Sequence, residues 1–158
     1  MKKGLSLIES VVVIMLAAII ASVVALYIRE SLTAWDFMSG QKNITSSSRA
    51  AGLRLVRELK RIKNNAGLSV QASTEVEFTD IDDKTINFRQ DGTRLMRNQD
   101  VLSDKLSSPG GLLLTYLDKA GAATSDQKQV KTIRVRITAI NGQNKFVMES
   151  AARLRNTD

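Results

Sequence analysis

The sequence predicts an α+β protein in which a long amino-terminal helix packs on an antiparallel β-sheet domain. An apolar run extends from Leu5 to Ile28. An amphipathic helical pattern continues beyond this run to about residue 65. After Gly67 the apolar residues alternate with polar ones at a period of two, which is typical of strands. The 158 residues therefore divide into a helical part and a β part long enough for one small domain.

The apolar run is long enough to cross a membrane. Its 24 residues, Leu5 to Ile28, are apolar apart from Tyr27, three serines and the carboxylate of Glu9. As a helix this segment spans roughly 36 Å, and a hydrocarbon core is about 30 Å thick. A carboxylate within such a segment costs on the order of 2.5–3.5 kcal/mol on insertion scales, less near an interface. We therefore expect a partner that neutralises Glu9.

Charge around this segment predicts its orientation. Lys2 and Lys3 precede it, whereas Arg29 is balanced by Glu30 on the far side. The positive-inside rule places the amino terminus in the cytoplasm and the chain after Tyr27 outside.

An apolar stripe predicts that the helix continues onto the domain. The stripe recurs at helical spacing and consists of Ile44, Ala51, Leu55, Leu59 and Ile62. Gly40 and the Thr45–Ser48 run are expected to bend or interrupt the helix, and Asn64–Gly67 is expected to end it. The sheet should cover the stripe. The basic residues from Arg54 to Lys63 should form a solvated face or contact a neighbouring subunit.

Several strands and two hairpins are predicted after Gly67, in a sheet of five or six antiparallel strands. Strands are expected around Val76–Phe78, Ile86–Phe88 and Gly111–Leu117, with a turn at Asp91–Gly92. A two-residue turn there would place Arg89 opposite Arg94, which leaves that register open. Asn141–Gly142 favours a type I′ turn with Ile140 opposite Gln143. The register then pairs Ile137 with Phe146, Val135 with Met148 and Arg134 with Glu149.

The amino-terminal pattern resembles a known processing signal. Gly4 separates the basic leader from the apolar run, and cleavage after Gly4 would make Glu9 the fifth residue of the mature chain. This arrangement resembles the class III signal of type IV pilins and type II secretion pseudopilins. Those families usually begin the mature chain with Phe, where this chain has Leu5. The resemblance implies cleavage by a prepilin peptidase, N-methylation of Leu5, and pairing of Glu9 with the Leu5 ammonium of an adjoining subunit during assembly.

Looser motifs in the second half resemble the J-type pseudopilins and W-type minor pilins. They comprise a helix of the Leu53–Leu59 type, Phe78–Asp80, Asp91–Gly92 with Leu95 and Arg97, Leu113–Tyr116, and Leu154–Asn156. The resemblance implies a pilin-like fold and a minor subunit of a tip or initiation complex. Its segments would be a leader (1–4), a transmembrane assembly helix (5–28), a helix continuation (29–66) and an antiparallel β domain (67–158).

This resemblance also implies partners and a location. The subunit would sit in the bacterial inner membrane with its domain in the periplasm, and would assemble with other pilin-like subunits in a pilus or pseudopilus. Secreted cargo is a further candidate partner. An alternative that the sequence leaves open is a single-pass, inner-membrane anchored binding protein that never polymerises.

Composition argues against enzymatic and cofactor roles. The chain has no Cys and no His, so it lacks the commonest general base and transition-metal ligand. Ser46–Ser48 therefore have no histidine to activate a nucleophile. We expect no catalytic site, cofactor or metal, although Asp80, Asp82 and Asp83 leave calcium open beside a plain turn.

Nucleic acid is a minor alternative. The formal net charge is +7, or +5 after loss of Lys2 and Lys3, since 21 basic residues then face 16 acidic ones. Aromatic platforms for base stacking are scarce, and Trp35 lies near the membrane boundary, where such rings commonly anchor. We therefore do not expect DNA uptake to be the main role.

Overall fold

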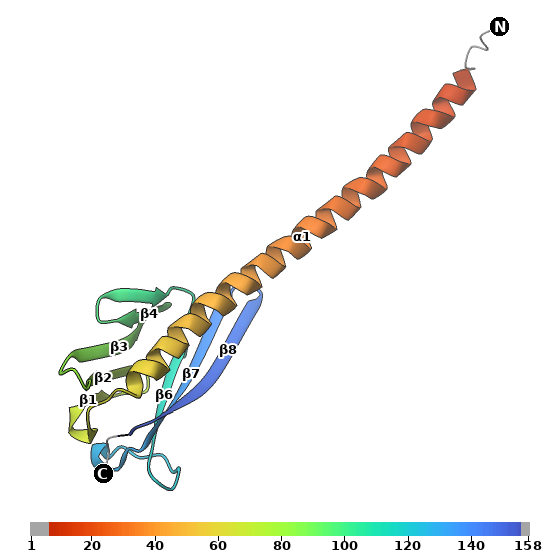
Figure 1. Cartoon of the computed structure of the whole chain (residues 1–158). Helices are drawn as coiled ribbons and strands as arrows, with labels where there is room; N and C mark the ends of the chain where they lie inside the picture. The colour runs from red at the N-terminus through yellow and green to blue at the C-terminus, as the bar shows by residue number, and fades with distance from the viewer. Residues whose placement is uncertain (1–6, 156–158) are drawn as a thin grey trace. The chain divides into compact units, whose positions relative to one another are not determined.

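The computed structural model describes residues 7–155 and shows one long helix with two antiparallel sheets (Figure 1). The predicted α+β class is confirmed. The chain divides into two compact units, Met1–Ser39 and Gly40–Asp158, and both sheets belong to the second. The helices are α1 (Leu7–Leu59) and the short 3₁₀ segments η1 (Asn65–Gly67) and η2 (Gln127–Gln129). The strands are β1 (Leu68–Gln71), β2 (Glu75–Thr79), β3 (Thr85–Asp91), β4 (Arg94–Arg97), β5 (Asp100–Ser103), β6 (Leu112–Leu117), β7 (Thr132–Asn141) and β8 (Asn144–Arg153).

Helix α1 is continuous where the sequence predicts a bend or break. Gly40 and the serine run lie within its 53 residues. The hydroxyls of Ser46 and Ser47 donate to the carbonyl oxygen of Asn43 at 3.1 and 2.9 Å, so these side chains are satisfied inside the helix. The expected interruption is wrong because packing against the domain outweighs the low helix propensity of this stretch.

The helix also ends earlier than predicted, at Leu59 rather than near residue 65. The chain after Leu59 joins the edge of the first sheet: Ile62 pairs with Asp80, and the N–H of Lys63 donates to the carbonyl oxygen of Thr79 at 3.1 Å. Asn64 caps η1 instead, accepting a hydrogen bond from the N–H of Gly67 at 2.8 Å. Sheet pairing, absent from the local sequence signal, ends the helix.

The predicted apolar stripe is buried against both sheets. Ile44, Leu55 and Leu59 are fully inaccessible to solvent, and Ala51 and Ile62 nearly so. From Ala51 onward the stripe packs into one core with residues of both sheets, and in this core the rings of Phe78 and Phe88 stack with centroids 6.4 Å apart. The prediction that the sheet covers this face of the helix is confirmed.

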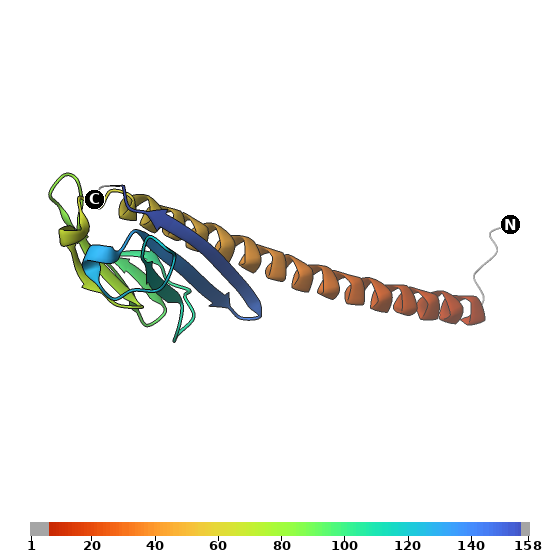
Figure 2. The ribbon, with the colours of Figure 1, turned by 90° about the horizontal axis from the view of Figure 1, so that it is seen from below.

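Small residues let α1 lie close to β7 and β8, and Figure 2 shows these strands alongside the helix. Ser48 and Gly52 share the buried face of α1. A Cβ atom added at Gly52 would lie 2.9 Å from Sδ of Met148 and 3.0 Å from Cδ1 of Ile137. The close approach therefore depends on the missing side chain at Gly52.

The strands form two sheets instead of the single sheet expected. The first has the order β1-β2-β3-β4-β5 and the second β6-β7-β8. Strands β1 and β5 were not predicted, because neither shows a clear alternation of apolar residues. Strand β6 links the sheets through the N–H of Leu114, which donates to the carbonyl oxygen of Ser73 at 2.7 Å. The hydroxyl of Tyr116 donates to the carbonyl oxygen of Ala72 at 3.1 Å, and burial, with the charge of Glu75, raises its pKa.

Both hairpins differ by two residues from the register considered in the sequence. In β7–β8, Asn141 pairs with Asn144, and Gly142 occupies the first turn position with φ of +60°. Type I′ needs a positive φ at both central residues, whereas here only Gly142 has one and Gln143 does not, which is the type II′ pattern. Arg136, not Arg134, therefore pairs with Glu149. A shift of two leaves each residue on its predicted face, so the buried set is preserved.

The β3–β4 hairpin shows the same behaviour. Gly92 has φ of +58° and Asp91 pairs with Arg94. This register places opposite charges across the turn and avoids the Arg89–Arg94 pair of the alternative register.

Candidate functional site

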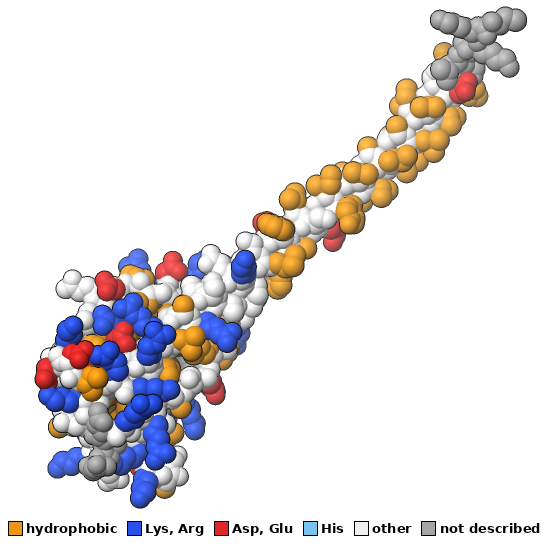
Figure 3. Space-filling view, in the orientation of Figure 1, with side chains coloured by type: hydrophobic (Ala, Val, Ile, Leu, Met, Phe, Trp, Pro, Cys, Tyr) orange, Lys and Arg blue, Asp and Glu red, His pale blue; other side chains and the backbone are white. Residues whose placement is uncertain are grey.

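The described part of the first unit presents apolar side chains to its surroundings along its helix. α1 is the one helix among the described residues that is long and apolar enough to cross a membrane. From Leu7 to Ile28, at about 1.5 Å per residue, it covers roughly 33 Å. Large apolar side chains here are at least half exposed with few exceptions, as the orange side chains in Figure 3 show. This helix could therefore span a membrane.

Polar hydroxyls along this helix are satisfied within it. The Ser22 hydroxyl donates to the carbonyl oxygen of Ala18 at 2.8 Å, and the Thr33 hydroxyl donates to that of Arg29 at 3.0 Å. Because lipid offers no hydrogen-bond partner, this internal bonding lowers the cost of placing a serine such as Ser22 in the bilayer.

Glu9 lies in the first turn of α1 and its side chain is exposed. A carboxylate at this end of a helix is favoured by the partial positive charge of the helix amino terminus. Gly4 and Leu5, the predicted cleavage and methylation positions, lie outside the described residues. The geometry therefore places Glu9 at the start of the apolar helix, close in sequence to Leu5.

Farther along the same unit, Leu32 and Trp35 are exposed by 61 and 69% respectively. These side chains lie beyond the apolar run, after Arg29 and Glu30.

The Ser46–Ser48 run makes structural contacts in the described part of the chain. Ser46 and Ser47 bond back to α1, and Ser48 is fully buried with its Oγ 3.5 Å from Oγ of Ser103. The contact of Ser48 links the helix to β5.

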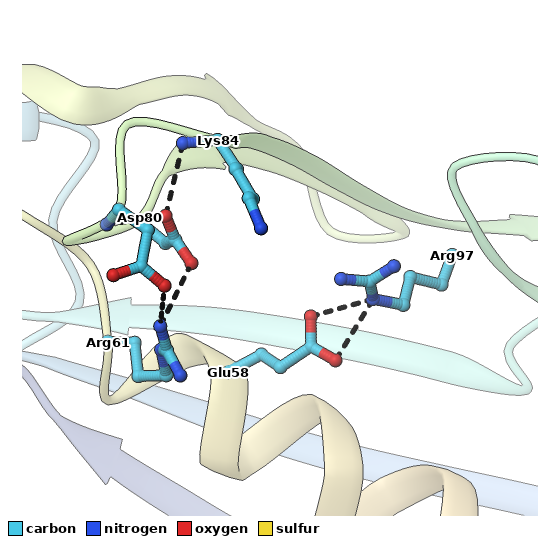
Figure 4. Close-up of polar contacts among 6 residues, drawn as sticks. Glu58, Arg61, Asp80, Lys84 and Arg97 are labelled. Atoms are coloured by element: carbon cyan, nitrogen blue, oxygen red, sulfur yellow. Dashed lines mark hydrogen bonds and ion pairs between the residues drawn. The ribbon is translucent and has the colours of Figure 1, made fainter.

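The three aspartates of the predicted acidic cluster form the turn between β2 and β3. Asp80 is buried, and its Oδ1 accepts hydrogen bonds from the N–H groups of Asp82 at 2.8 Å and Lys84 at 3.1 Å (Figure 4). Arg61 contacts both Asp80 and Asp82, while Lys63 pairs with Asp83. Among the described residues no group of His, Cys, Asp or Glu side chains is arranged to hold a metal ion. The turn interpretation fits this geometry.

Replacing Asp80 with alanine should lower the free energy of unfolding by about 1–3 kcal/mol, because two N–H groups at a buried position lose their acceptor. Asp82→Ala is the matched control: its side chain is exposed and makes only a surface ion pair, so we expect a loss below about 1 kcal/mol. Urea unfolding of the full chain in detergent measures both. Equal losses would contradict the role given to Asp80.

One ion pair between helix and sheet was not predicted. Nε of Arg97 on β4 donates to both carboxylate oxygens of Glu58, at 2.9 and 2.7 Å (Figure 4). Arg54 also binds Glu58, at 3.0 Å. Both side chains of the Glu58–Arg97 pair are largely buried. The sequence contains one indication that Glu58 forms an ion pair, because Glu58 is the lone acidic residue between Asp36 and Glu75.

No protein-family model, no curated protein and no solved structure matches this chain. The long helix with two antiparallel sheets defines an α+β protein with a candidate membrane-spanning segment.

Proposed function

We propose that this chain is a minor pilin-like subunit of a type II secretion pseudopilus or type IV pilus, most similar to the J-type subunits, and that it works by assembly. One observation carries the proposal. A single helix has exposed apolar side chains over its first part and a buried stripe, from Ile44 to Leu59, over its last part. The first part is suited to lipid and to other helices, and the last part anchors the domain.

The residues of the amino-terminal signal favour a pilin-like helix over a plain membrane anchor. The leader, Gly4, Leu5 and Glu9 occur together at the spacing of a prepilin signal. An uncleaved anchor would need the hydrophobic length but neither the glycine nor the carboxylate. The proposal includes cleavage after Gly4 by a prepilin peptidase that also methylates the amino group of Leu5.

Location follows from the same proposal. The amino terminus is cytoplasmic, the helix crosses the bacterial inner membrane once, and the β domain lies in the periplasm until the subunit enters a pilus or pseudopilus. Its partners are other pilin-like subunits in a tip or initiation complex, and secreted cargo is a further candidate. The chain itself performs no catalysis and needs no cofactor.

The mature amino terminus tests this proposal. In cells that carry a prepilin peptidase, we expect mass spectrometry to find a chain that begins at Leu5 with one added methyl group. Gly4→Val should accumulate as the uncleaved precursor in the membrane, because cleavage beside an embedded helix requires a small residue there.

Leu5→Phe is the matched control for this experiment. It installs the residue with which the resembling families usually begin and should be processed like the natural chain. An intact Met1 in the natural protein would overturn the proposal in favour of an anchored binding protein that never polymerises. Normal cleavage of Gly4→Val would count equally against it.

A further inference from the structure

A cavity of about 880 Å³ lies in the β domain at the end of α1. Four parts of the chain line it: the residue after α1, the loop after β6, the start of β7, and the end of β8 with the residues that follow it. Its size is near the upper end of the range for ligand sites, about 300–1,000 Å³. The hollow is therefore larger than a single small ion needs.

Basic side chains dominate the lining. Among the described lining residues five are basic and one, Asp118, is acidic, which makes a formal excess of four positive charges; the basic residues are Lys60, Lys119, Lys131, Arg153 and Arg155. Figure 3 shows Lys and Arg side chains gathered over the domain. We call this site the basic cavity.

Asp118, the one carboxylate among the described lining residues, makes hydrogen bonds within its own loop. Oδ1 of Asp118 accepts hydrogen bonds from the N–H groups of Ala120 at 2.8 Å and Ala122 at 2.9 Å. The N–H of Asp118 also donates to the carbonyl oxygen of Ala122 at 2.9 Å. Asp118 therefore shapes the loop that carries Lys119 and offers limited compensation to the surrounding cations.

Main-chain bonds build the walls of the basic cavity. The N–H of Lys131 donates to the carbonyl oxygen of Leu117 at 2.8 Å, and the N–H of Leu154 donates to that of Lys131 at 2.9 Å. These bonds connect the ends of β6 and β8 through the residue before β7. The convergence of basic residues is therefore set by the fold, although they are distant in sequence.

Elsewhere between residues 40 and 155, five of the fifteen basic side chains form ion pairs with acidic ones. Arg54, Arg61, Lys63, Arg97 and Arg136 all form ion pairs. None of the ion pairs between described residues includes Lys60, Lys119, Arg153 or Arg155. Like charges gathered in a hollow focus a positive potential there, which raises the local concentration of an anionic ligand.

We propose that the basic cavity binds an acidic polypeptide segment, whose Asp and Glu carboxylates pair with its lysines and arginines. The cations are spread around a large hollow and so match several carboxylates along a chain. The described lining contains no aromatic side chain for base stacking. The helix end at the cavity is the carboxyl end of α1, which lacks the N–H groups that commonly hold a compact phosphate. This inference does not depend on the proposed function.

Peptide binding by the full-length protein in neutral detergent tests the inference. The probe is fluorescein-labelled hexaglutamate, with hexaglutamine as the uncharged comparison, and anisotropy measures binding. We expect hexaglutamate alone to bind, with affinity falling as salt rises from about 50 to about 300 mM, because the contacts are charged and accessible.

Charge reversal locates the site. Lys119→Glu with Arg153→Glu should weaken hexaglutamate binding by about tenfold or more, because two attractive contacts become repulsive. The matched control, Lys145→Glu with Arg94→Glu, makes the same change in net charge at exposed positions outside the lining and should alter affinity by less than about twofold. Lys119→Gln with Arg153→Gln, which removes charge without reversing it, should give an intermediate loss and serves if the reversed variant fails to fold.

Three results would overturn the inference. Hexaglutamate could fail to bind. The control pair could also weaken binding as much as the lining pair, which would show that net charge alone explains the loss of affinity. Tripolyphosphate or single-stranded DNA could bind more tightly than hexaglutamate with the same dependence on Lys119 and Arg153. That last result would assign the basic cavity to phosphates instead of an acidic peptide.

Discussion

Glu9→Ala should leave cleavage intact and reduce incorporation into fibres or tip complexes by about tenfold or more. In a stack of parallel helices, the Glu9 carboxylate can accept a hydrogen bond from the ammonium group of Leu5 in an adjoining subunit. Such a charge-assisted contact is strong in a medium without competing water. Without the carboxylate, the neighbouring ammonium would remain in lipid without this counter-charge. The measurement is the fraction of processed subunit recovered with sheared fibres or with co-purified pilin-like subunits.

Two further variants make this experiment specific. Glu9→Asp keeps the charge on a shorter side chain and should retain part of the incorporation. Glu30→Ala removes one negative charge from the same helix beyond the apolar run, and should incorporate nearly as well as the natural chain. Unchanged incorporation of Glu9→Ala, or an equal defect in Glu30→Ala, would contradict an assembly role for Glu9.

Leu55→Ala should lower the free energy of unfolding of the domain by about 2–5 kcal/mol. Leu55 is fully buried between α1 and the sheets, so truncation removes apolar contacts and leaves a cavity in the core. Domains of this size are stable by only about 5–15 kcal/mol, so the loss is a large share of the total. Hydrogen exchange followed by mass spectrometry, on peptides from the β strands of the full chain in detergent, measures it.

Leu53→Ala provides the matched control two residues away on the same helix. Its side chain is 48% exposed and lies outside the core, so the same chemical change should cost less than about 1 kcal/mol. Similar losses for the two variants would show that α1 contributes helix propensity but little packing to the domain.

The hairpins show how far local sequence patterns reach. Asp91–Gly92 and Asn141–Gly142 located both turns, because glycine adopts the positive φ that a tight turn needs. They did not determine whether glycine takes the first or the second turn position. The two positions give strand registers that differ by two residues. Alternation with a period of two predicted the correct buried faces under either choice. Only cross-strand packing decided the partners, such as Arg136 with Glu149.

The end of α1 shows the same limit. The sequence predicted a stop at Asn64–Gly67 from local signals, and Asn64 does cap a helix there, the short η1. α1 itself ends at Leu59 because residues 61–63 form backbone bonds with the β2–β3 region. These bonds join residues 16 to 20 positions apart, so no local window contains the information.

The sequence by itself determined the α+β class, the apolar amino-terminal helix, the buried face of its continuation and the location of most strands. These features follow from residue periodicity and from the length of the apolar run, both of which are local. The tertiary structure alone decided the division into two sheets, the register of each hairpin, the Glu58–Arg97 pair and the convergence of Lys60, Lys119 and Arg153 around one cavity. These features depend on which distant segments pack together, and packing energy between distant segments leaves no periodic trace in the chain.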